Sequence, residues 1–241
     1  MNNRQTIKER RRHQKKQQRL ITILIASGVA LILAVLLVLP TIRYALTPVG
    51  EFVQPPLVPR PMANGNTMGD PNAPVLIEEF SDFACGYCGV FPQETGAEIE
   101  NIYVSTGKVY FISRSSGSLI GHLNTPLAAE AAYCAADQNK YWEYQDIVFA
   151  NQRTLFADPT AKIDKFLAAF AESLELDMGA FDDCVDSRKY RDRVRQDELD
   201  AIKANISATP SFLINGMLLE GAQPFAEFEK IIEAELATTG N

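Results

Sequence analysis

The chain is poor in the side chains from which metal sites are built. Among its 241 residues there are two histidines, His13 and His122, and four cysteines. A zinc site needs four ligands gathered together, and these few residues show no spacing typical of one. The residue after Cys88 is Gly89, so the cysteine–histidine pattern of covalent haem attachment is absent too. The sequence therefore predicts neither a metal site nor another bound cofactor.

Positive charge is scarce once the first 19 residues are set aside. Those residues hold eight Lys and Arg against one acid, a net charge of +7, whereas the whole chain carries −7. Residues 20–241 therefore carry −14, and so acidic a protein is a poor ligand for nucleic acid. We expect no nucleic-acid partner, and we assign residues 1–19 to a basic cytoplasmic tail that is attracted to anionic lipid.

One long apolar run follows this basic segment. Residues 21–39 contain no charge, and 19 residues are enough to cross a bilayer as a helix. The alternative is a cleaved signal peptide, which has a shorter apolar region of about 7–15 residues and a small-residue cleavage site. No convincing site follows, so we expect a retained transmembrane anchor over residues 20–40. The positive-inside rule then predicts a cell-membrane protein with its N-terminus in the cytoplasm and the remainder outside.

Proline is concentrated in one segment after the apolar run. Eight of the 13 prolines lie between residues 40 and 74, with no periodic apolar face among them. Such a composition favours extended polyproline conformations. We therefore predict a Pro-rich tether over residues 41–73. One domain should follow over residues 74–241, a length that suits a single core.

Apolar periodicity predicts the order of elements in that domain. Alternating or short apolar stretches indicate strands, and apolar residues three and four apart indicate helices. The pair Asn215-Gly216 favours the tight turn of a β-hairpin. The expected order is a strand (75–80), a helix (85–105) that is bent or interrupted near Pro92, a strand (108–113), a helical block that ends near residue 206, a hairpin (211–219) and a helix after Pro224.

The four residues Cys85-Gly86-Tyr87-Cys88 stand where the first strand pattern gives way to a helical one. The free amides and the dipole of a first helical turn stabilise a thiolate at the first cysteine. The second cysteine lies one helical turn further on, so the two sulfurs can form a disulfide with little backbone movement. This position predicts a redox-active pair in which Cys85 is the nucleophile.

Several separate motifs accompany this pair in a fixed order. They are DPNAPV (70–75), EFSDFACGYC (79–88), AYCAADQ (132–138), YWEY (141–144) and ATPSFLING (208–216). Together they resemble the DsbA-like thiol–disulfide oxidoreductases, and in particular the membrane-anchored bacterial branch of that family. The resemblance covers about residues 69–228. It implies an α/β, thioredoxin-like fold with a helical insertion over about residues 120–206.

The resemblance also assigns roles to residues. Cys85 matches the exposed nucleophile of the family and Cys88 its buried partner. Thr209-Pro210 matches the cis-proline loop, which faces the cysteines and pairs with the substrate backbone. An isolated Thr-Pro bond would more often be trans, but an X-Pro bond adopts the cis form at modest cost. Beside this motif we expect the bond to be cis and the loop to bind substrate.

Glu79 is a candidate for proton transfer to or from Cys88. It lies in the first strand, and a carboxyl buried beneath the following helix could exchange a proton with the second cysteine. Because side chains alternate along a strand, only one of Glu78 and Glu79 can point inward. The alternative is therefore that Glu78 is the buried residue and Glu79 faces solvent.

The other two cysteines, Cys134 and Cys184, both fall in the helical block. An even number of cysteines and an oxidising compartment favour a structural disulfide between them. Two buried free thiols are the alternative.

The dipeptide between the redox cysteines leaves the direction of reaction open. Family members often carry Pro or another residue and then His or Tyr, whereas this chain has Gly86-Tyr87 and no histidine there. The dipeptide tunes the reduction potential. We expect an oxidase that introduces disulfides into exported proteins, and the resemblance implies reoxidation by a membrane partner of the DsbB or vitamin-K-epoxide-reductase type. The alternatives are a reductase or isomerase with the same site, or a non-catalytic binding or chaperone module.

Overall fold

The computed structural model describes residues 3–115, 121, 124–157 and 162–239. The chain divides into two compact units, Met1–Val49 and Gly50–Asn241, which we describe separately. His122, considered above as a metal ligand, lies outside the described residues.

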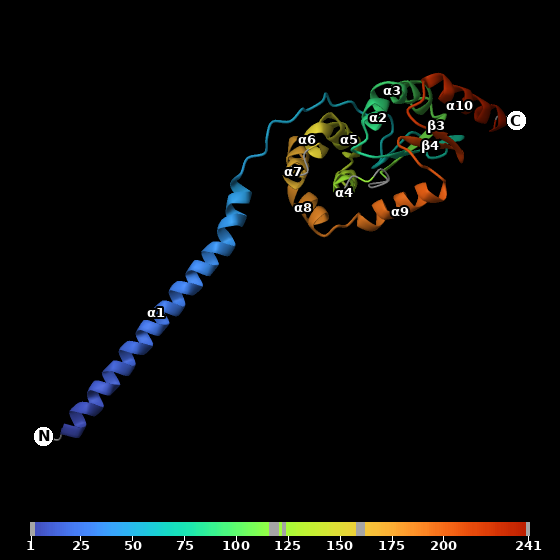
Figure 1. The fold of residues 1–241 in the computed structure, drawn as a ribbon. Coiled ribbons are helices and arrows are strands. Elements are labelled where there is room, and N and C mark those ends of the chain that lie inside the picture. Colours follow the sequence, from blue (N-terminus) through green and yellow to red (C-terminus); the bar gives the residue numbers. More distant parts are fainter. Residues whose placement is uncertain (1–2, 116–120, 122–123, 158–161, 240–241) are drawn as a thin grey trace. The chain divides into compact units, whose positions relative to one another are not determined.

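The first unit is a single helix, α1 (Asn3–Leu46), which contains Pro40. Its part from Lys15 to Pro40 is long and apolar enough to cross a membrane (Figure 1). A signal sequence near the N-terminus would have the same properties. The retained anchor over residues 20–40 therefore stays a prediction.

The second unit contains a five-stranded sheet in the order β1-β3-β2-β4-β5. The central strand β2 pairs in parallel with β3 and antiparallel with β4, and β1 and β5 add antiparallel edges. This is the mixed α/β arrangement that the sequence predicts. The strands are β1 (Thr67–Met68), β2 (Val75–Ser81), β3 (Val109–Ser115), β4 (Ser211–Ile214) and β5 (Met217–Glu220).

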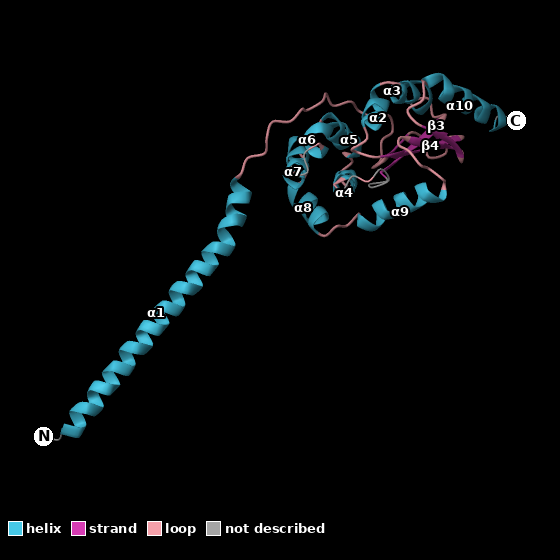
Figure 2. Cartoon of the chain, in the orientation of Figure 1, coloured by secondary structure: helices cyan, strands magenta, loops and turns pink. Residues whose placement is uncertain are grey.

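Helices cover both faces of the sheet. The short α3 (Thr95–Ile99) and α10 (Phe225–Thr239) lie on one side, and α9 (Arg191–Lys203) lies on the other (Figure 1). Alternation along β2 sends Val75 and Ile77 into the main core, whereas Phe80 packs with Ala201 of α9. Figure 2 shows the strands enclosed between these helices. Residues 79 and 81 therefore belong to the face covered by α3 and α10.

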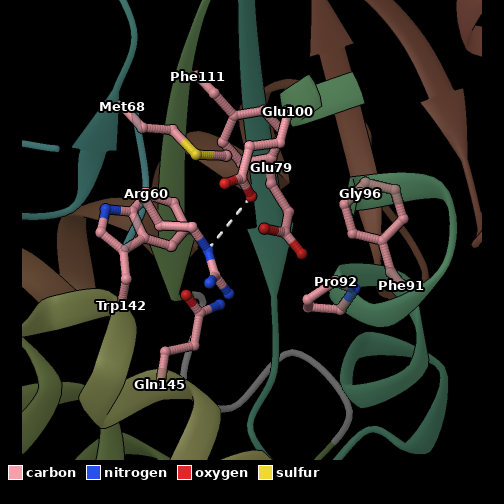
Figure 3. A pocket seen from close by; sticks show the side chains of 10 residues that line it. All are labelled: Arg60, Met68, Glu79, Phe91, Pro92, Gly96, Glu100, Phe111, Trp142 and Gln145. Carbon is pink, nitrogen blue, oxygen red and sulfur yellow. Dashed lines mark ion pairs between the residues drawn. The ribbon is translucent and has the colours of Figure 1, made fainter. Parts of the chain in front are cut away.

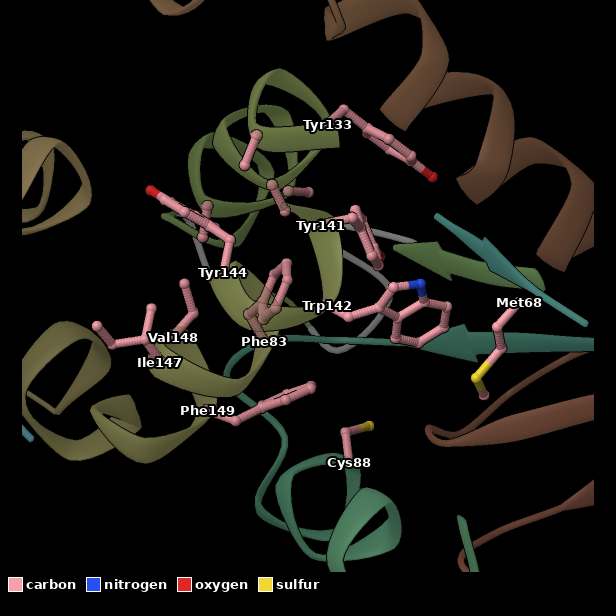
Figure 4. Close-up of a cluster of buried hydrophobic side chains, with 14 of the residues drawn as sticks. Met68, Phe83, Cys88, Tyr133, Tyr141, Trp142, Tyr144, Ile147, Val148 and Phe149 are labelled. Carbon is pink, nitrogen blue, oxygen red and sulfur yellow. The ribbon is translucent and has the colours of Figure 1, made fainter. Parts of the chain in front are cut away.

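A helical insertion separates β3 from β4, as the resemblance implies. Aromatic side chains of α5 fill its core together with Phe83 (Figure 4). Cys134 of α4 and Cys184 of α8 form a disulfide, which confirms the predicted pairing. Before α9, the helices are α4 (Thr125–Ala136), α5 (Tyr141–Ala150), α6 (Gln152–Phe156), α7 (Ile163–Ser173) and α8 (Met178–Asp186).

The helix predicted over residues 85–105 is broken into short pieces. It consists of α2 (Gly86–Val90), a 3₁₀ turn (Phe91–Gln93), α3 and a π-helical turn (Glu100–Val104). Pro92 cannot continue an α-helical hydrogen-bond ladder, and Glu94 after it has a non-helical backbone (φ −114°, ψ −102°). The interruption predicted near Pro92 is therefore confirmed.

The tether predicted over residues 41–73 is also too long. Residues up to Leu46 continue α1, and the chain from Gly50 onward belongs to the second unit. We call residues 50–66 the strap. The Phe52 ring lies 5.0 Å from that of Phe170, and the backbone of Val53 exchanges two hydrogen bonds with the Asn151 side chain. An extended Pro-rich chain keeps its backbone groups unpaired, so they are available to side-chain amides of the domain.

Candidate active site at the start of helix α2

A tight turn presents the two cysteines at the end of β2. The Asp82 side chain accepts a hydrogen bond from the Ala84 amide (2.8 Å), and its carbonyl accepts one from the Cys85 amide (3.0 Å). Cys85 then stands as the residue before α2. On the other side, the Gln152 side chain donates to the carbonyls of Phe83 and Cys85, each at 2.8 Å. The backbone that carries the nucleophile is thus held from both sides.

The two cysteines are both buried and differ slightly in exposure. Both cysteines are free thiols, with Cys85 8% exposed and Cys88 fully buried. The Cys85 sulfur lies 3.2 Å from the carbonyl oxygen of Thr209. The Thr209–Pro210 peptide bond is cis, as expected. The structure therefore brings the predicted substrate loop against the predicted nucleophile, although these residues are 124 positions apart.

The surroundings separate the pKa values of the two thiols. The pKa of Cys85 is lowered to about 5, chiefly by a hydrogen bond from the Cys88 thiol and, against the opposing effect of burial, also by hydrogen bonds from Thr209 and the backbone amides of Cys88 and Tyr87. Burial, followed by the influence of Cys85, raises the pKa of Cys88 well above its ordinary value. Near neutral pH, Cys85 is therefore a thiolate and Cys88 a protonated thiol.

Glu79 points inward and Glu78 outward, which resolves the alternative left open by the sequence. Glu79 is 2% exposed, and Glu78 forms an ion pair with Arg114. Burial raises the pKa of Glu79 to about 8, although a hydrogen bond with Ser81 lowers it. The Ser81 hydroxyl also forms a hydrogen bond with the Cys88 thiol. This bond slightly lowers the pKa of Cys88, which burial raises. Ser81 thus connects the carboxyl to the buried cysteine.

A cavity of about 20 Å³ lies beside Glu79. Figure 3 shows the Glu79 carboxyl pointing from β2 into the space between Arg60 and Pro92. Within the described residues, Glu79 Oε1 has no hydrogen-bond partner. The volume suits about one water molecule. The other residues that line the cavity are Met68, Phe91, Gly96, Glu100, Phe111, Trp142 and Gln145.

The surface beside Cys85 is apolar. Tyr87, between the two cysteines, is 72% exposed, and Val90 at the end of α2 is exposed as well. Gly89 lies between them on the inner side, where an added Cβ would approach the Gln152 side chain to 3.0 Å. Helix α2 therefore packs tightly against Gln152 on its inner side and exposes Tyr87 and Val90 on its outer side.

Sequence reasoning found the central residues and missed their neighbours. The structure brings together Cys85, Cys88, Thr209, Pro210 and Glu79, and it places the Cys134–Cys184 disulfide elsewhere, in the helical insertion. Ser81 could have been found, because it is two residues from Glu79 on the same strand face. Arg60, Glu100, Asp146 and Gln152 carried no comparable signal, since they come from separate segments.

Comparison with known proteins supports the fold. The family profile described as thioredoxin matches residues 62–234. Among solved structures, α-DsbA1 from Wolbachia pipientis superimposes with a TM-score of 0.62 at 24% identity, covering 74% of this chain and 94% of that one.

Curated relatives are of two kinds. A probable disulfide bond formation protein D from Bacillus cereus is 28% identical over 88% of this chain and 97% of its own length. A Na⁺/H⁺ antiporter NhaA 3 from Salinispora tropica is 31% identical over 66% of this chain, which spans only 23% of the antiporter. That match covers too little of the antiporter for its transport activity to be carried over. With the profile match over most of the chain, the chain belongs to the thioredoxin family and has the fold of its DsbA-like members.

Proposed function

We propose that this protein is a membrane-anchored, extracytoplasmic thiol–disulfide oxidoreductase that introduces disulfides into exported proteins. The observation that carries the proposal is the contrast within one site. A low-pKa Cys85, slightly exposed, lies against the cis-proline loop, and a fully buried Cys88 with a raised pKa lies behind it. The Bacillus cereus relative, named for disulfide bond formation, supports the same chemistry.

The reaction consists of two thiol–disulfide exchanges. A substrate thiolate attacks the Cys85 sulfur of the Cys85–Cys88 disulfide, a mixed disulfide forms, and Cys88 leaves as a thiolate. A second substrate thiolate then attacks the substrate sulfur of that mixed disulfide and releases Cys85. The substrate loses two electrons and gains a disulfide, and the enzyme gains both electrons. Thr209 and Pro210 hold the substrate backbone, and Tyr87 and Val90 offer it apolar contact.

Proton movement accompanies only one of the two leaving groups. Because the pKa of Cys85 is about 5, Cys85 leaves as a thiolate and remains one. Cys88 must gain a proton, since burial raises its pKa well above the ordinary value. Glu79, protonated near neutral pH because burial raises its pKa to about 8, supplies that proton through Ser81. Reoxidation reverses the transfer.

The low pKa of Cys85 favours the oxidising direction. A stabilised thiolate stabilises the reduced form of the pair, so the disulfide form becomes a stronger oxidant. Here the Cys88 thiol and the backbone amides provide the stabilisation that a histidine between the cysteines would otherwise supply. The Gly86-Tyr87 dipeptide is therefore compatible with an oxidase.

The anchor and the reoxidising partner belong to the same proposal. The apolar part of α1 and the basic residues before it support a single span with the N-terminus in the cytoplasm. The domain would then face the exported proteins. A quinone-linked membrane protein of the DsbB or vitamin-K-epoxide-reductase type would withdraw the two electrons.

The test is oxidative refolding of a reduced, unfolded protein by the full chain, run beside insulin reduction. We expect the oxidised chain to restore substrate disulfides, with the Cys85→Ser variant at background. Strong insulin reduction without refolding would instead identify a reductase. No turnover in either assay would leave a binding or chaperone module and overturn the proposal.

A further inference from the structure

A second group of ionisable side chains lies next to Glu79 and is not used by the two exchanges. Arg60, from the strap, pairs with Glu100 at 3.3 Å and with Asp146 at 2.9 Å. Their side chains are 9%, 15% and 19% exposed, so the group is largely removed from water. We call these three residues the Arg60 cluster.

The cluster connects the interior cavity with the surface. Arg60 and Glu100 line the small cavity into which Glu79 points (Figure 3). Both also line a groove of about 600 Å³ between the strap and the helices, where Asp146 joins them. Asp146 does not reach the cavity. The order from inside to outside is therefore Glu79, then Glu100 with Arg60, then Asp146.

The cluster has one carboxyl more than it has cations. A single guanidinium cannot neutralise two buried carboxylates, and burial is the main cause that raises the pKa of both. The pKa of Asp146 rises to about 6, against the lowering effect of Arg60. One of the two carboxyls can thus accept or release a proton near neutral pH.

We propose that the Arg60 cluster is the outlet through which Glu79 exchanges its proton with solvent, across the cavity that they share. This inference rests on the proposed function, because it concerns the proton that Cys88 takes up on reduction and gives up on reoxidation. On reoxidation, Cys88 gives its proton to Glu79 through Ser81. Glu79 passes a proton by way of a cavity water to Glu100, and Asp146 releases one to the groove. Arg60 is a positioning residue that holds the two carboxyls together and favours their ionised forms.

Other charged groups face this path and act on its pKa values. Burial is the main cause that raises the pKa of Glu79, and the charge of Cys85 raises it by a smaller amount. Glu79 in turn is among the groups that raise the pKa of Tyr141. Glu143 adds a small raising effect on the pKa of Asp146, and it is held by Lys140 at 3.0 Å. Cys85, Tyr141 and Glu143 do not line the cavity, so they change pKa values along the path without forming part of it.

The experiment follows the one step that needs the proton to leave. Reduced full-length protein is mixed with oxidised glutathione, so that the Cys85 thiolate forms a mixed disulfide and releases one glutathione. Cys88 must then lose its proton, attack the Cys85 sulfur and release the second glutathione. Acid quenching and mass spectrometry at a series of pH values give the rate of this second step. For the parent, we expect a rate that rises with pH.

Two variants separate a proton path from a simple charge effect. Arg60→Gln should shift the profile about one pH unit to the alkaline side, which makes the step about tenfold slower below the midpoint. Asp146→Asn should also slow the step, because an acceptor is lost. A purely electrostatic role predicts the reverse for Asp146→Asn, since removing a negative charge lowers the pKa of Glu79 and speeds the step.

Controls distinguish this inference from the proposed function. Arg60→Lys should restore the parental profile, and Arg114→Gln, which breaks a comparable ion pair on the other sheet face, should not shift it. Trp142, the only tryptophan, lines the cavity and reports by fluorescence that each variant is folded. Parental pH profiles for folded Arg60→Gln and Asp146→Asn, or a faster Asp146→Asn, would overturn the outlet. Failure of the parent to release the second glutathione would instead contradict the proposed function.

Discussion

Cys134 and Cys184 form a disulfide between helices α4 and α8, whereas Cys85 and Cys88, three residues apart, are free thiols. Both pairs are largely buried, so burial alone does not make one of them reactive. The difference lies in what surrounds the sulfurs. The redox pair has amides, a cis-proline loop and a buried carboxyl beside it, and the structural pair lies between packed helices.

The comparison teaches that an asymmetric environment is what makes a cysteine pair catalytic. Interactions that stabilise a thiolate act on Cys85, and burial destabilises one on Cys88. A substrate thiolate can therefore attack the Cys85 sulfur, and Cys88 then leaves and takes up a proton. The predictions below change the redox pair, the structural pair or the carboxyl beside the redox pair, and they test whether chemistry and stability respond separately.

The largest effect is expected from exchanging single redox cysteines. Cys85→Ser should abolish mixed-disulfide formation, because the nucleophile is lost. Cys88→Ser should accumulate mixed disulfides with exported proteins, because the resolving thiol is missing. Non-reducing gels of membranes from cells expressing each variant measure this. The assignment would be wrong if Cys85→Ser trapped substrate as efficiently as Cys88→Ser does.

The structural pair should affect stability rather than chemistry. Its disulfide closes a loop of 50 residues, which the chain-entropy relation values at roughly 4 kcal/mol. The double variant Cys134→Ser/Cys184→Ser should lose about that much free energy of unfolding. Urea unfolding of the full-length protein measures this loss. Its rate of glutathione exchange at Cys85 should stay parental at temperatures where it is folded. A large loss of exchange rate in the folded variant would show that the two pairs are coupled.

Much of the redox site could be predicted from the sequence because its residues lie in short, local motifs. A strand followed by Cys85-Gly86-Tyr87-Cys88 fixes the position of both sulfurs, and the Thr209-Pro210 motif points to the loop opposite them. Alternation along β2 limited the buried carboxyl to Glu78 or Glu79 but could not choose between them. The choice depends on Arg114, which pairs with Glu78 from β3 and lies outside that local pattern.

What could not be predicted depends on contacts between distant segments. Pro-rich composition indicates an extended chain but not whether that chain is free, so the docking of the strap on Asn151 and Phe170 was missed. Arg60 was missed for the same reason. The break of the helix at Pro92 was suspected from the proline, but the π-helical turn at residues 100–104, which includes Glu100, has no signal in the sequence.

A smaller effect is expected from changing Glu79, the buried carboxyl beside the redox pair. Burial raises its pKa from 4.5 to about 8, so the folded state binds its proton more tightly than the unfolded state. The contribution of this proton to the free energy of unfolding is therefore fully present below about pH 4.5 and is lost as the pH rises toward 8. Glu79→Gln removes this loss and should raise the unfolding free energy by about 3 kcal/mol at pH 7, with little change at pH 4.

Urea unfolding at both pH values measures this effect. Glu78→Gln is the matched control, because its carboxyl pairs with Arg114 and removing it should not stabilise the protein. Equal stabilisation by Glu79→Gln at pH 4 and pH 7 would mean that the gain comes from packing rather than from the proton.

The most direct test of the account is the pKa of Cys85, followed by the ultraviolet absorbance of its thiolate in the reduced full chain. The account predicts a midpoint near pH 5 in the parent, since the Cys88 thiol is the largest cause of the lowered pKa. Cys88→Ala should raise the midpoint, and Cys134→Ser/Cys184→Ser should leave it in place. A parental midpoint near 9, the ordinary value of a thiol, would contradict the account.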